Sequence, residues 1–314
     1  MNLEQLRGFV AVAQVGNFTR AAEQLHLAQP SLSRQISSLE QDLGAELLHR
    51  SRAGTTLTAA GESLLPLARR MLADAESVRR ELDELAGLRR GRVRLGAPPT
   101  LCVSLVAEAL SVFHGAHPGI ELHVSEQGSR RLLDELAGGE LDLALITTSD
   151  SASADRFTVT PLLVEELVVI SSSGSAPIAG RDGIRLREVA GLPLIVFSSS
   201  YDLRATTDAA FQAGGLSPDV IIEGVEMDAV LRFVERGIGV AIVPAVVLVD
   251  RPGLRATRLT DPTLTRAISI ARVADIAPAA ASVVMERAIT RTATILAARP
   301  ESTMRLAAAA ESPF

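Results

Sequence analysis

The segment from Gln29 to Leu43 carries one apolar and one polar face at helical spacing. Leu32, Ile36 and Leu39 recur every three or four residues and predict a buried face. The opposite face carries hydroxyl, guanidinium and amide groups, at Pro30, Ser33, Arg34, Ser37 and Gln41. Arginine can bind guanine in bidentate fashion, glutamine can bind adenine similarly, and serine hydroxyls can reach phosphates. The segment could therefore contact DNA, although a solvated face of another small helical unit has the same pattern.

Two short helices and a turn position this polar face. Asn2 can cap a first helix. We expect Thr19 to cap a second, short helix, and residues 26–28 to form the turn after it. Pro30 suits the first position of the next helix, and Gly44 is a natural C-terminal glycine. The order predicts a helix-turn-helix made of the short helix, the turn and the helix that starts near Pro30. The latter helix of such a motif typically lies in the DNA major groove.

From Phe18 to Gly61 the chain carries apolar, small and polar residues in a characteristic order. These residues are Ala21, Ala22, Leu25, Gln29, Pro30, Ser33, Gln35, Ile36, Leu39, Glu40, Leu43, Gly44, Leu47, Arg50, Leu57, Thr58 and Gly61. In this order the chain resembles the LysR-type transcriptional regulators, a large family of bacterial winged helix-turn-helix proteins. One departure is Leu48, where the family usually carries Phe, and an apolar exchange there changes little.

The resemblance implies a set of DNA contacts, most of them on the helix that starts near Pro30 and in the hairpin-like wing. His49, Arg50 and Arg52 cluster in the wing with no acid between them, where a DNA backbone or minor-groove contact would lie. A solvated loop is the alternative for the wing. The expected DNA-binding residues are Thr19, Gln29, Pro30, Ser31, Ser33, Arg34, Ser37, Arg50 and Arg52.

Net charge gives weak support for a nucleic-acid partner. Residues 1–58 hold five arginines and five acids, so their formal charges cancel, and the whole chain has net charge -6. A single copy should therefore bind DNA poorly, because phosphate contacts supply most of the affinity. All 31 basic residues are arginines, which favours bidentate recognition of anions wherever one faces a ligand.

A predicted long helix over residues 59–88 could make the protein a dimer. Apolar residues alternate spacings of four and three, which is a heptad seam, and they are Leu64, Ala68, Met71, Ala75, Val78, Leu82 and Leu85. A reader of palindromic half-sites needs two copies, which favours pairing. The alternative is an amphipathic helix packed on its own domain. We expect residues 1–58 to form the DNA-binding domain and residues 59–90 the dimerisation helix, with Leu64, Met71, Val78, Leu82 and Leu85 at the interface.

After Gly91 the sequence alternates between strands and helices, which predicts α/β sheets dominated by parallel strands. Two sheets fit better than one, because a polar connector lies near residues 149–155. The resemblance implies a two-lobed effector-binding domain, itself similar to periplasmic solute-binding proteins. The expected limits are 91–161 with 267–300 for lobe I, 162–266 for lobe II, and a frayed tail at 301–314.

Four predicted junctions that follow strands carry groups suited to binding a small anion. In open α/β sheets ligands lie past the carboxyl ends of strands, where helix N-termini present free N–H groups. The expected effector residues are Pro99, Thr100, Gln127, Ser129, Thr147, Thr148, Ser198, Ser199 and Arg204, and the simplest ligand is a carboxylate. Each hydroxyl could instead be a plain helix cap. Asp202 and Asp208 are equally natural partners of Arg204.

Other functional classes find little support in the sequence. The chain lacks nucleophile-elbow, zinc-protease and phosphate-loop motifs and spaced metal ligands, so we expect no enzyme, catalytic residue, metal or cofactor. Cys102 is the single cysteine, which excludes an internal disulfide and leaves an inert thiol or a redox role open.

The N-terminus does not read as a signal peptide and no apolar stretch looks long enough to span a membrane, so we expect a cytoplasmic protein. The leading hypothesis is a ligand-responsive regulator that binds double-stranded promoter DNA as a homodimer or homotetramer, and contacts RNA polymerase if it activates. The alternative is a solute-binding sensor with no role on DNA.

Overall fold

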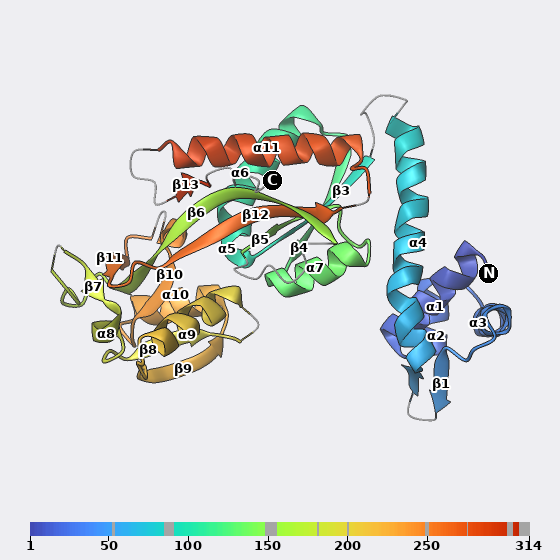
Figure 1. Ribbon diagram of the computed structural model, residues 1–314, viewed down its shortest axis with the longest axis horizontal. Helices are drawn as coiled ribbons and strands as arrows, with labels where there is room; N and C mark the ends of the chain where they lie inside the picture. Colours follow the sequence, from blue (N-terminus) through green and yellow to red (C-terminus); the bar gives the residue numbers. More distant parts are fainter. Residues whose placement is uncertain are drawn as a thin grey trace, which may run out of the picture.

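The computed structural model describes residues 1–51, 54–84, 91–147, 156–180, 182–199, 201–248, 251–274, 276–299 and 304–307. An N-terminal helical domain, a long helix and a larger α/β part follow one another along the chain (Figure 1).

Three helices and an antiparallel hairpin form the N-terminal domain. They are α1 (Leu3–Val15), α2 (Phe18–Gln24), α3 (Gln29–Leu43), β1 (Leu48–Ser51) and β2 (Gly54–Leu57). Asn2 caps α1, and Gly16 and Gly44 end α1 and α3 in the left-handed conformation. The predicted cap of α2 at Thr19 is wrong. Asn17 caps α2 instead, because the helix begins at Phe18 and leaves Thr19 inside its first turn.

The long helix α4 (Ala59–Glu84) contacts both parts of the protein. Ala68 is buried in the core of the N-terminal domain. At the next position, Arg69 forms an ion pair with Glu140 at 3.3 Å. Gly139 has φ +70° and lets the helix approach closely, since a Cβ there would lie 2.1 Å from the Cβ of Ala73. The position of the C-terminal part is therefore coupled to α4 within one chain.

One curved sheet runs through the C-terminal part, in the order β4-β3-β5-β12-β6-β11-β7, with β10 and β13 also paired to β6; β8 and β9 form a separate parallel pair. The strands are β3 (Gly91–Ala97), β4 (Ile120–Glu126), β5 (Leu143–Ile146), β6 (Phe157–Ser172), β7 (Ile184–Arg185), β8 (Leu194–Phe197), β9 (Val220–Val225), β10 (Ala241–Pro244), β11 (Leu254–Thr260), β12 (Thr265–Val273) and β13 (Met304–Leu306). The helices are α5 (Pro99–Leu101), η1 (Cys102–Val106), α6 (Ala107–Ala116), α7 (Ser129–Ala137), α8 (Leu186–Val189), α9 (Asp202–Ala213), α10 (Met227–Glu235), η2 (Ala245–Leu248) and α11 (Ala280–Ala297).

The prediction of two parallel-dominated sheets is wrong. The 16-residue strand β6 runs antiparallel to β10, β11, β12 and β13, and joins both lobes in one sheet. The sequence pattern revealed only its last part, because Pro161 and two glutamates interrupt the apolar run. The strand tolerates Pro161 at a bulge, where the register with β12 shifts between Ile268 and Ser269.

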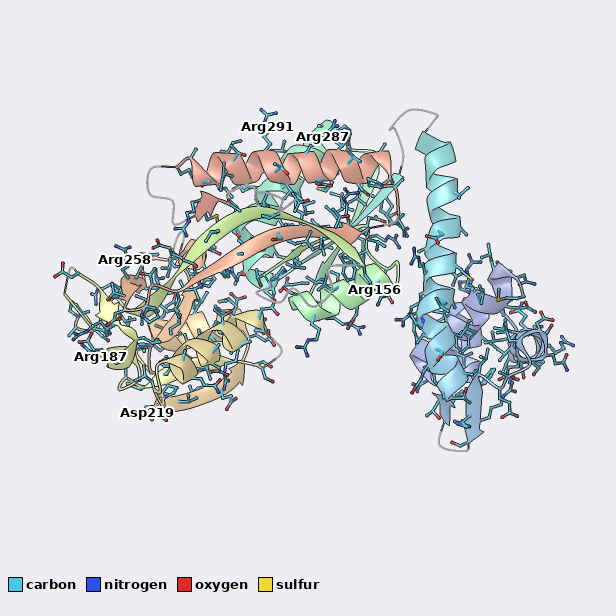
Figure 2. All side chains as sticks on the ribbon, viewed as in Figure 1. Arg156, Arg187, Asp219, Arg258, Arg287 and Arg291 are labelled. Carbon is cyan, nitrogen blue, oxygen red and sulfur yellow. The ribbon has the colours of Figure 1, made fainter. Side chains whose placement is uncertain are left out.

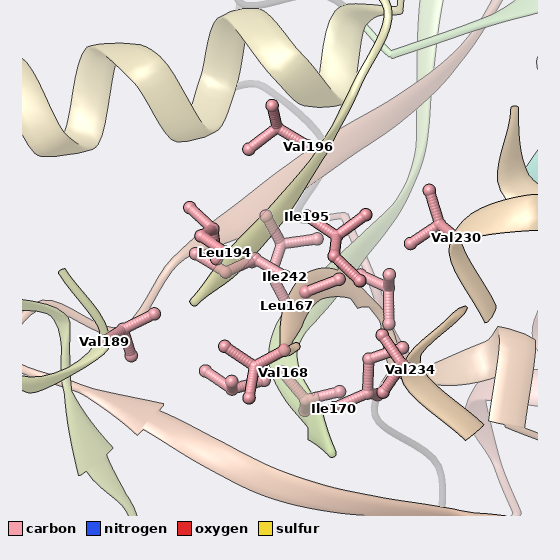
Figure 3. Close-up of a cluster of buried hydrophobic side chains, with 14 of the residues drawn as sticks. Leu167, Val168, Ile170, Val189, Leu194, Ile195, Val196, Val230, Val234 and Ile242 are labelled. Carbon is pink, nitrogen blue, oxygen red and sulfur yellow. The ribbon is translucent and has the colours of Figure 1, made fainter. Parts of the chain in front are cut away.

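Separate apolar cores in the two halves of the C-terminal part confirm the predicted two-lobed architecture. The core of lobe II packs β6, β8 and β10 against α10 and includes Leu167, Ile195 and Val230 (Figure 3). The core of lobe I packs β3, β5 and β12 against α6 and α11. Arg287 and Arg291 are exposed and project from the outer side of α11 (Figure 2). The predicted limits of the lobes fall inside β6 and β12, and the domain limits stay predictions.

Two further expectations about the ends and the apolar segments need correction. The helical run from Pro99 to Ala116 is 18 residues long with mean hydropathy 1.3, so a stretch of the chain is long and apolar enough to cross a membrane. One face of it, including Leu105 and Phe113, is buried in the core of lobe I, as in a core helix.

In the tail, Met304–Leu306 is not frayed, because Met304 packs into the core of lobe I and the strand pairs with β6. The rest of the tail lies outside the described residues, apart from Ala307, whose N–H donates to the Leu162 carbonyl.

Candidate DNA-binding surface and effector cleft

The polar face of α3 is exposed at its N-terminal end. Gln29, Pro30 and Arg34 are exposed, and Ser31, Ser33 and Ser37 are half-buried beside them. Proline occupies the first turn, and Leu32, Ile36 and Leu39 are fully buried on the other side. Among the described residues, the Arg34 guanidinium makes one long hydrogen bond, 3.4 Å to Ser31 Oγ, which leaves its other donors available for a partner.

Arg50 is braced against α3 rather than extended from the hairpin. Its guanidinium donates to Ser33 Oγ at 3.1 Å and Ser37 Oγ at 3.4 Å. It lies 3.6 Å from a Glu40 carboxylate oxygen and 4.7 Å from the ring centroid of Phe18. Arg50 therefore joins α2, α3 and β1 at the edge of the predicted DNA-binding surface.

The side chain of Glu40 holds the start of the hairpin against α3. Its Oε1 accepts a hydrogen bond from the backbone N–H of Leu47 at 2.9 Å, and that of Leu48 lies at 3.4 Å.

Thr19 is exposed on α2, and Arg52 lies outside the described residues. The surface thus gathers eight of the nine predicted DNA contacts from three elements.

The predicted dimerisation helix has an exposed apolar stripe. Leu64 packs against the core of its own domain, as the alternative had it. Leu67, Met71 and Val78 are exposed, and Val78 keeps 57% of its surface accessible. The side chain of Leu82 and all of Leu85 lie outside the described residues.

Three of the predicted effector residues meet between the lobes around Asp202, which the sequence suggested only as a partner of Arg204. The Asp202 carboxylate of lobe II accepts hydrogen bonds at one oxygen, Oδ2, from Ser129 N at 2.9 Å, Thr147 Oγ1 at 3.0 Å, and Ser129 Oγ. The Thr147 N–H in turn donates to Ser129 Oγ at 2.8 Å. Thr100 completes the lining of this space, which measures about 10 Å³.

A buried ion pair supports the same cleft. Arg266 donates to Glu165 at 2.9 and 2.8 Å and to Thr100 Oγ1 at 2.9 Å, and Glu165 is fully buried. Both charged residues lie on the two strands, β6 and β12, that pass between the lobes. The pattern gave no sign of them, because the partners of Arg266 are 101 and 166 residues away along the chain.

Pro99 and Gln127 line a larger cavity of about 490 Å³ next to this network. The two spaces share Pro99, Gly128 and Tyr201, whose hydroxyl bonds to Glu226. A volume of this size is typical of a ligand pocket.

Among the described residues, Arg204 does not join the network. Arg204 is held on lobe II by Asp208 at 2.7 Å and Glu223 at 2.9 Å. Ser198 and Ser199 follow β8 but do not line either space as described, and Thr148 lies outside the described residues.

Cys102 has the properties of an inert thiol. It is partly buried two residues after Thr100, with Sγ 3.6 Å from the Ala97 carbonyl oxygen. Burial, and secondarily the charge of Glu126, raises the pKa of its thiol from 9.0 to about 12. Within the described residues, no group of three or more His, Cys, Asp or Glu side chains could hold a metal ion.

Comparison with known proteins identifies the class that this architecture defines. The model of the bacterial regulatory helix-turn-helix protein, lysR family, matches residues 3–62, and that of the LysR substrate binding domain matches residues 86–293. The chain is 32% identical over 273 residues to a probable nitrogen assimilation transcriptional activator of Synechococcus elongatus, covering 86% of this chain and 88% of that one. It is 31% identical over 271 residues to the HTH-type transcriptional regulator YybE of Bacillus subtilis, covering 86% and 92%.

Among solved structures, a full-length OxyR variant from Pseudomonas aeruginosa is similar with a TM-score of 0.72 and 26% identity, over 92% of this chain and 98% of that one. The chain belongs to the LysR family of bacterial regulators. It is a transcriptional regulator that joins a DNA-binding helix-turn-helix domain to an effector-binding domain, in a family of transcription factors rather than enzymes. The alternative of a solute-binding sensor without a role on DNA is not favoured.

Proposed function

We propose that α3 reads the bases of promoter DNA, with Arg34 and Gln29 at the base edges. The observation that carries this is the exposed end of α3, where Arg34 has no carboxylate partner among the described residues. An unpaired guanidinium on an exposed helix is free to bind guanine in bidentate fashion. Pro30, Ser31, Ser33 and Ser37 line the same face and approach the bases or the phosphates. Thr19, Arg50 and Arg52 contact the DNA backbone beside them.

Replacing Arg34 by alanine tests the base-reading role. We expect Arg34→Ala to weaken specific binding by about 5–150-fold, since a good bidentate contact contributes about 1–3 kcal/mol of discrimination. The measurement is footprinting and titration on the intergenic region upstream of the gene. The fold should be unchanged, because the side chain is exposed and makes one long hydrogen bond.

Arg7→Ala is the matched control, because Arg7 is an arginine of α1 paired with Glu4. It should leave the footprint intact. Equal protection by the Arg34→Ala protein at equal concentration would refute the base-reading role.

We further propose that the regulator acts in the cytoplasm as a homodimer or homotetramer, paired through the exposed stripe of Leu67, Met71 and Val78 on α4. The balanced charge of residues 1–58 supports this, because two copies double the number of phosphate contacts. Leu82 and Leu85 extend the stripe in sequence. If the protein activates transcription, RNA polymerase is a further partner.

The effector is proposed to be a small anion, most simply a carboxylate, bound between the lobes. Support comes from the donors Ser129 and Thr147, which are already arranged around a carboxylate oxygen. The adjoining cavity of about 490 Å³, lined in part by Pro99 and Gln127, offers space for the body of such a molecule. A ligand-dependent change in the relative position of the lobes would shift α4, which contacts lobe I through Arg69.

A further inference from the structure

The donors between the lobes are fully used by the protein itself. Asp202 Oδ2 accepts from the Ser129 N–H, the Ser129 hydroxyl and the Thr147 hydroxyl. These donors belong to lobe I and the carboxylate to lobe II, and they lie 73 and 55 residues apart. The contact is therefore a direct bond between the lobes across the cleft.

The contact has the chemistry of a bound anion rather than of an ion pair. Arg266, which lines the same space, is paired with Glu165, and Arg204, on the same helix as Asp202, is paired with Asp208. Asp202 is held by N–H and O–H groups, one of them at the N-terminus of the nine-residue helix α7, where negative charge is favoured. A free carboxylate would be bound by the same groups.

The space around Ser129 and Thr147 has room for one carboxylate, either that of Asp202 or that of an effector. The volume around the network is about 10 Å³, which is room for about one water molecule. A ligand in the adjoining cavity of about 490 Å³ would reach these donors past Tyr201, Pro99 and Gly128. Two carboxylates on the same donors would also repel each other. An effector carboxylate can use Ser129 and Thr147 only after Asp202 has left them.

We propose that Asp202 is a built-in carboxylate ligand that occupies the anion subsite of the effector cleft and holds the two lobes together until an effector displaces it. The inference rests on the proposed function, in that it places the effector in this cleft. It also restricts the effector class: the ligand must carry a carboxylate or an equivalent oxyanion to compete for these donors. A neutral molecule leaves the contact between the lobes in place.

Removing the internal carboxylate and supplying a free one tests the proposal. We expect Asp202→Ala to unfold at a lower temperature than the unmodified protein. Sodium formate or acetate should raise the melting temperature of this variant by about 2–4 °C, because the anion binds the vacated donors of the folded state. Sodium chloride at equal ionic strength should have no such effect.

Two matched variants separate the subsite from general salt effects. Asp202→Asn fills the same volume, so formate should give no shift beyond that of chloride. Asp208→Ala removes an exposed carboxylate of the same helix, one paired with Arg204, and should also show no formate response. If Asp202→Ala does not fold, Asp202→Ser, which retains a residue favoured at helix starts, gives the same measurement.

The outcome is read against DNA binding measured on the same preparations. A folded Asp202→Ala protein without a formate response, or equal responses in all variants, overturns the internal-ligand proposal. Such a protein that still protects promoter DNA leaves the proposed function standing. A selective formate response in Asp202→Ala, together with an unmodified protein that protects no promoter DNA, refutes the proposed function and retains the subsite.

Discussion

The DNA-binding surface and the effector cleft hold polar groups of similar type in opposite states. On α3, Arg34 and Gln29 are exposed, and within the part of the chain that the structure describes the Arg34 guanidinium makes a single hydrogen bond of 3.4 Å. In the cleft, Ser129, Thr147 and Thr100 are buried and all their side chains are bonded to charged partners. The polar groups on α3 can accept further contacts from a partner, whereas those in the cleft are already bonded within the protein.

This difference predicts how each surface responds to its ligand. When DNA binds, the exposed groups of α3 lose only their contacts with water. The affinity for DNA therefore depends on charge and on the salt concentration. An effector in the cleft must exchange its contacts for those of Asp202, so its net affinity is a difference between two similar interactions. The same exchange breaks a bond between the lobes, which is how binding can change the conformation.

The largest expected effect on stability lies in the cleft. Glu165→Leu leaves the Arg266 guanidinium buried without its carboxylate, and should lower the free energy of unfolding by about 3–5 kcal/mol. Urea denaturation followed by circular dichroism measures it. DNA binding by the protein that remains folded should be unchanged, because the pair lies on β6 and β12.

The double variant Glu165→Leu with Arg266→Met is the matched control. It removes both charges and should recover most of the loss, since a well-packed apolar pair often replaces a buried ion pair at no cost. A loss below about 1 kcal/mol in Glu165→Leu would mean that the cleft tolerates an unpaired charge, and the contrast with α3 would fail.

The two surfaces also differ in how far the sequence predicts them. The face of α3 follows from periodicity, and the caps at Asn2 and Gly44 follow from neighbouring residues. The cap at Asn17 was missed by two residues, because Thr19 is also of a type favoured at helix N-termini. Such contacts are short in sequence, so local rules describe them.

The cleft depends on contacts that no local rule reaches. Thr100, Ser129 and Thr147 were expected beside a ligand, because each follows a strand. Asp202 has the local pattern of an acid in the first turn of a helix, and only the packing of two lobes brings it to Ser129. The continuous strand β6 was missed for a related reason, since a proline and buried charge are unusual within a strand.

Arg50 should show an intermediate effect, because it is braced like a cleft residue and exposed like a DNA contact. Arg50→Ala removes its hydrogen bonds to Ser33 and Ser37 and its contact with the Phe18 ring. We expect a loss of about 1 kcal/mol in the free energy of unfolding, given its partial exposure. DNA affinity should fall similarly for all sequences, with a salt slope smaller by about 1.

Titrations at several salt concentrations, on the promoter and on unrelated DNA, measure these two effects for Arg50. Arg50→Lys serves as the control that retains charge and loses the fork geometry. If Arg50→Ala changes the preference for one base pair and leaves the salt slope intact, Arg50 reads bases and belongs with Arg34 instead.

The smallest expected effect concerns Cys102, which lies beside the cleft without taking part in it. Burial raises the pKa of its thiol to about 12, so the thiolate form appears only as the pH rises toward that value. At pH 9, where an unshifted thiol of pKa 9.0 is half ionised, about one Cys102 in a thousand should be. Alkylation of the folded protein should therefore be slow at neutral pH and become fast in urea, and peroxide should leave the footprint unchanged. Half-maximal alkylation rates near pH 9 in the folded protein, or a peroxide-dependent footprint lost in Cys102→Ser, would instead make the thiol a second responsive group of the cleft.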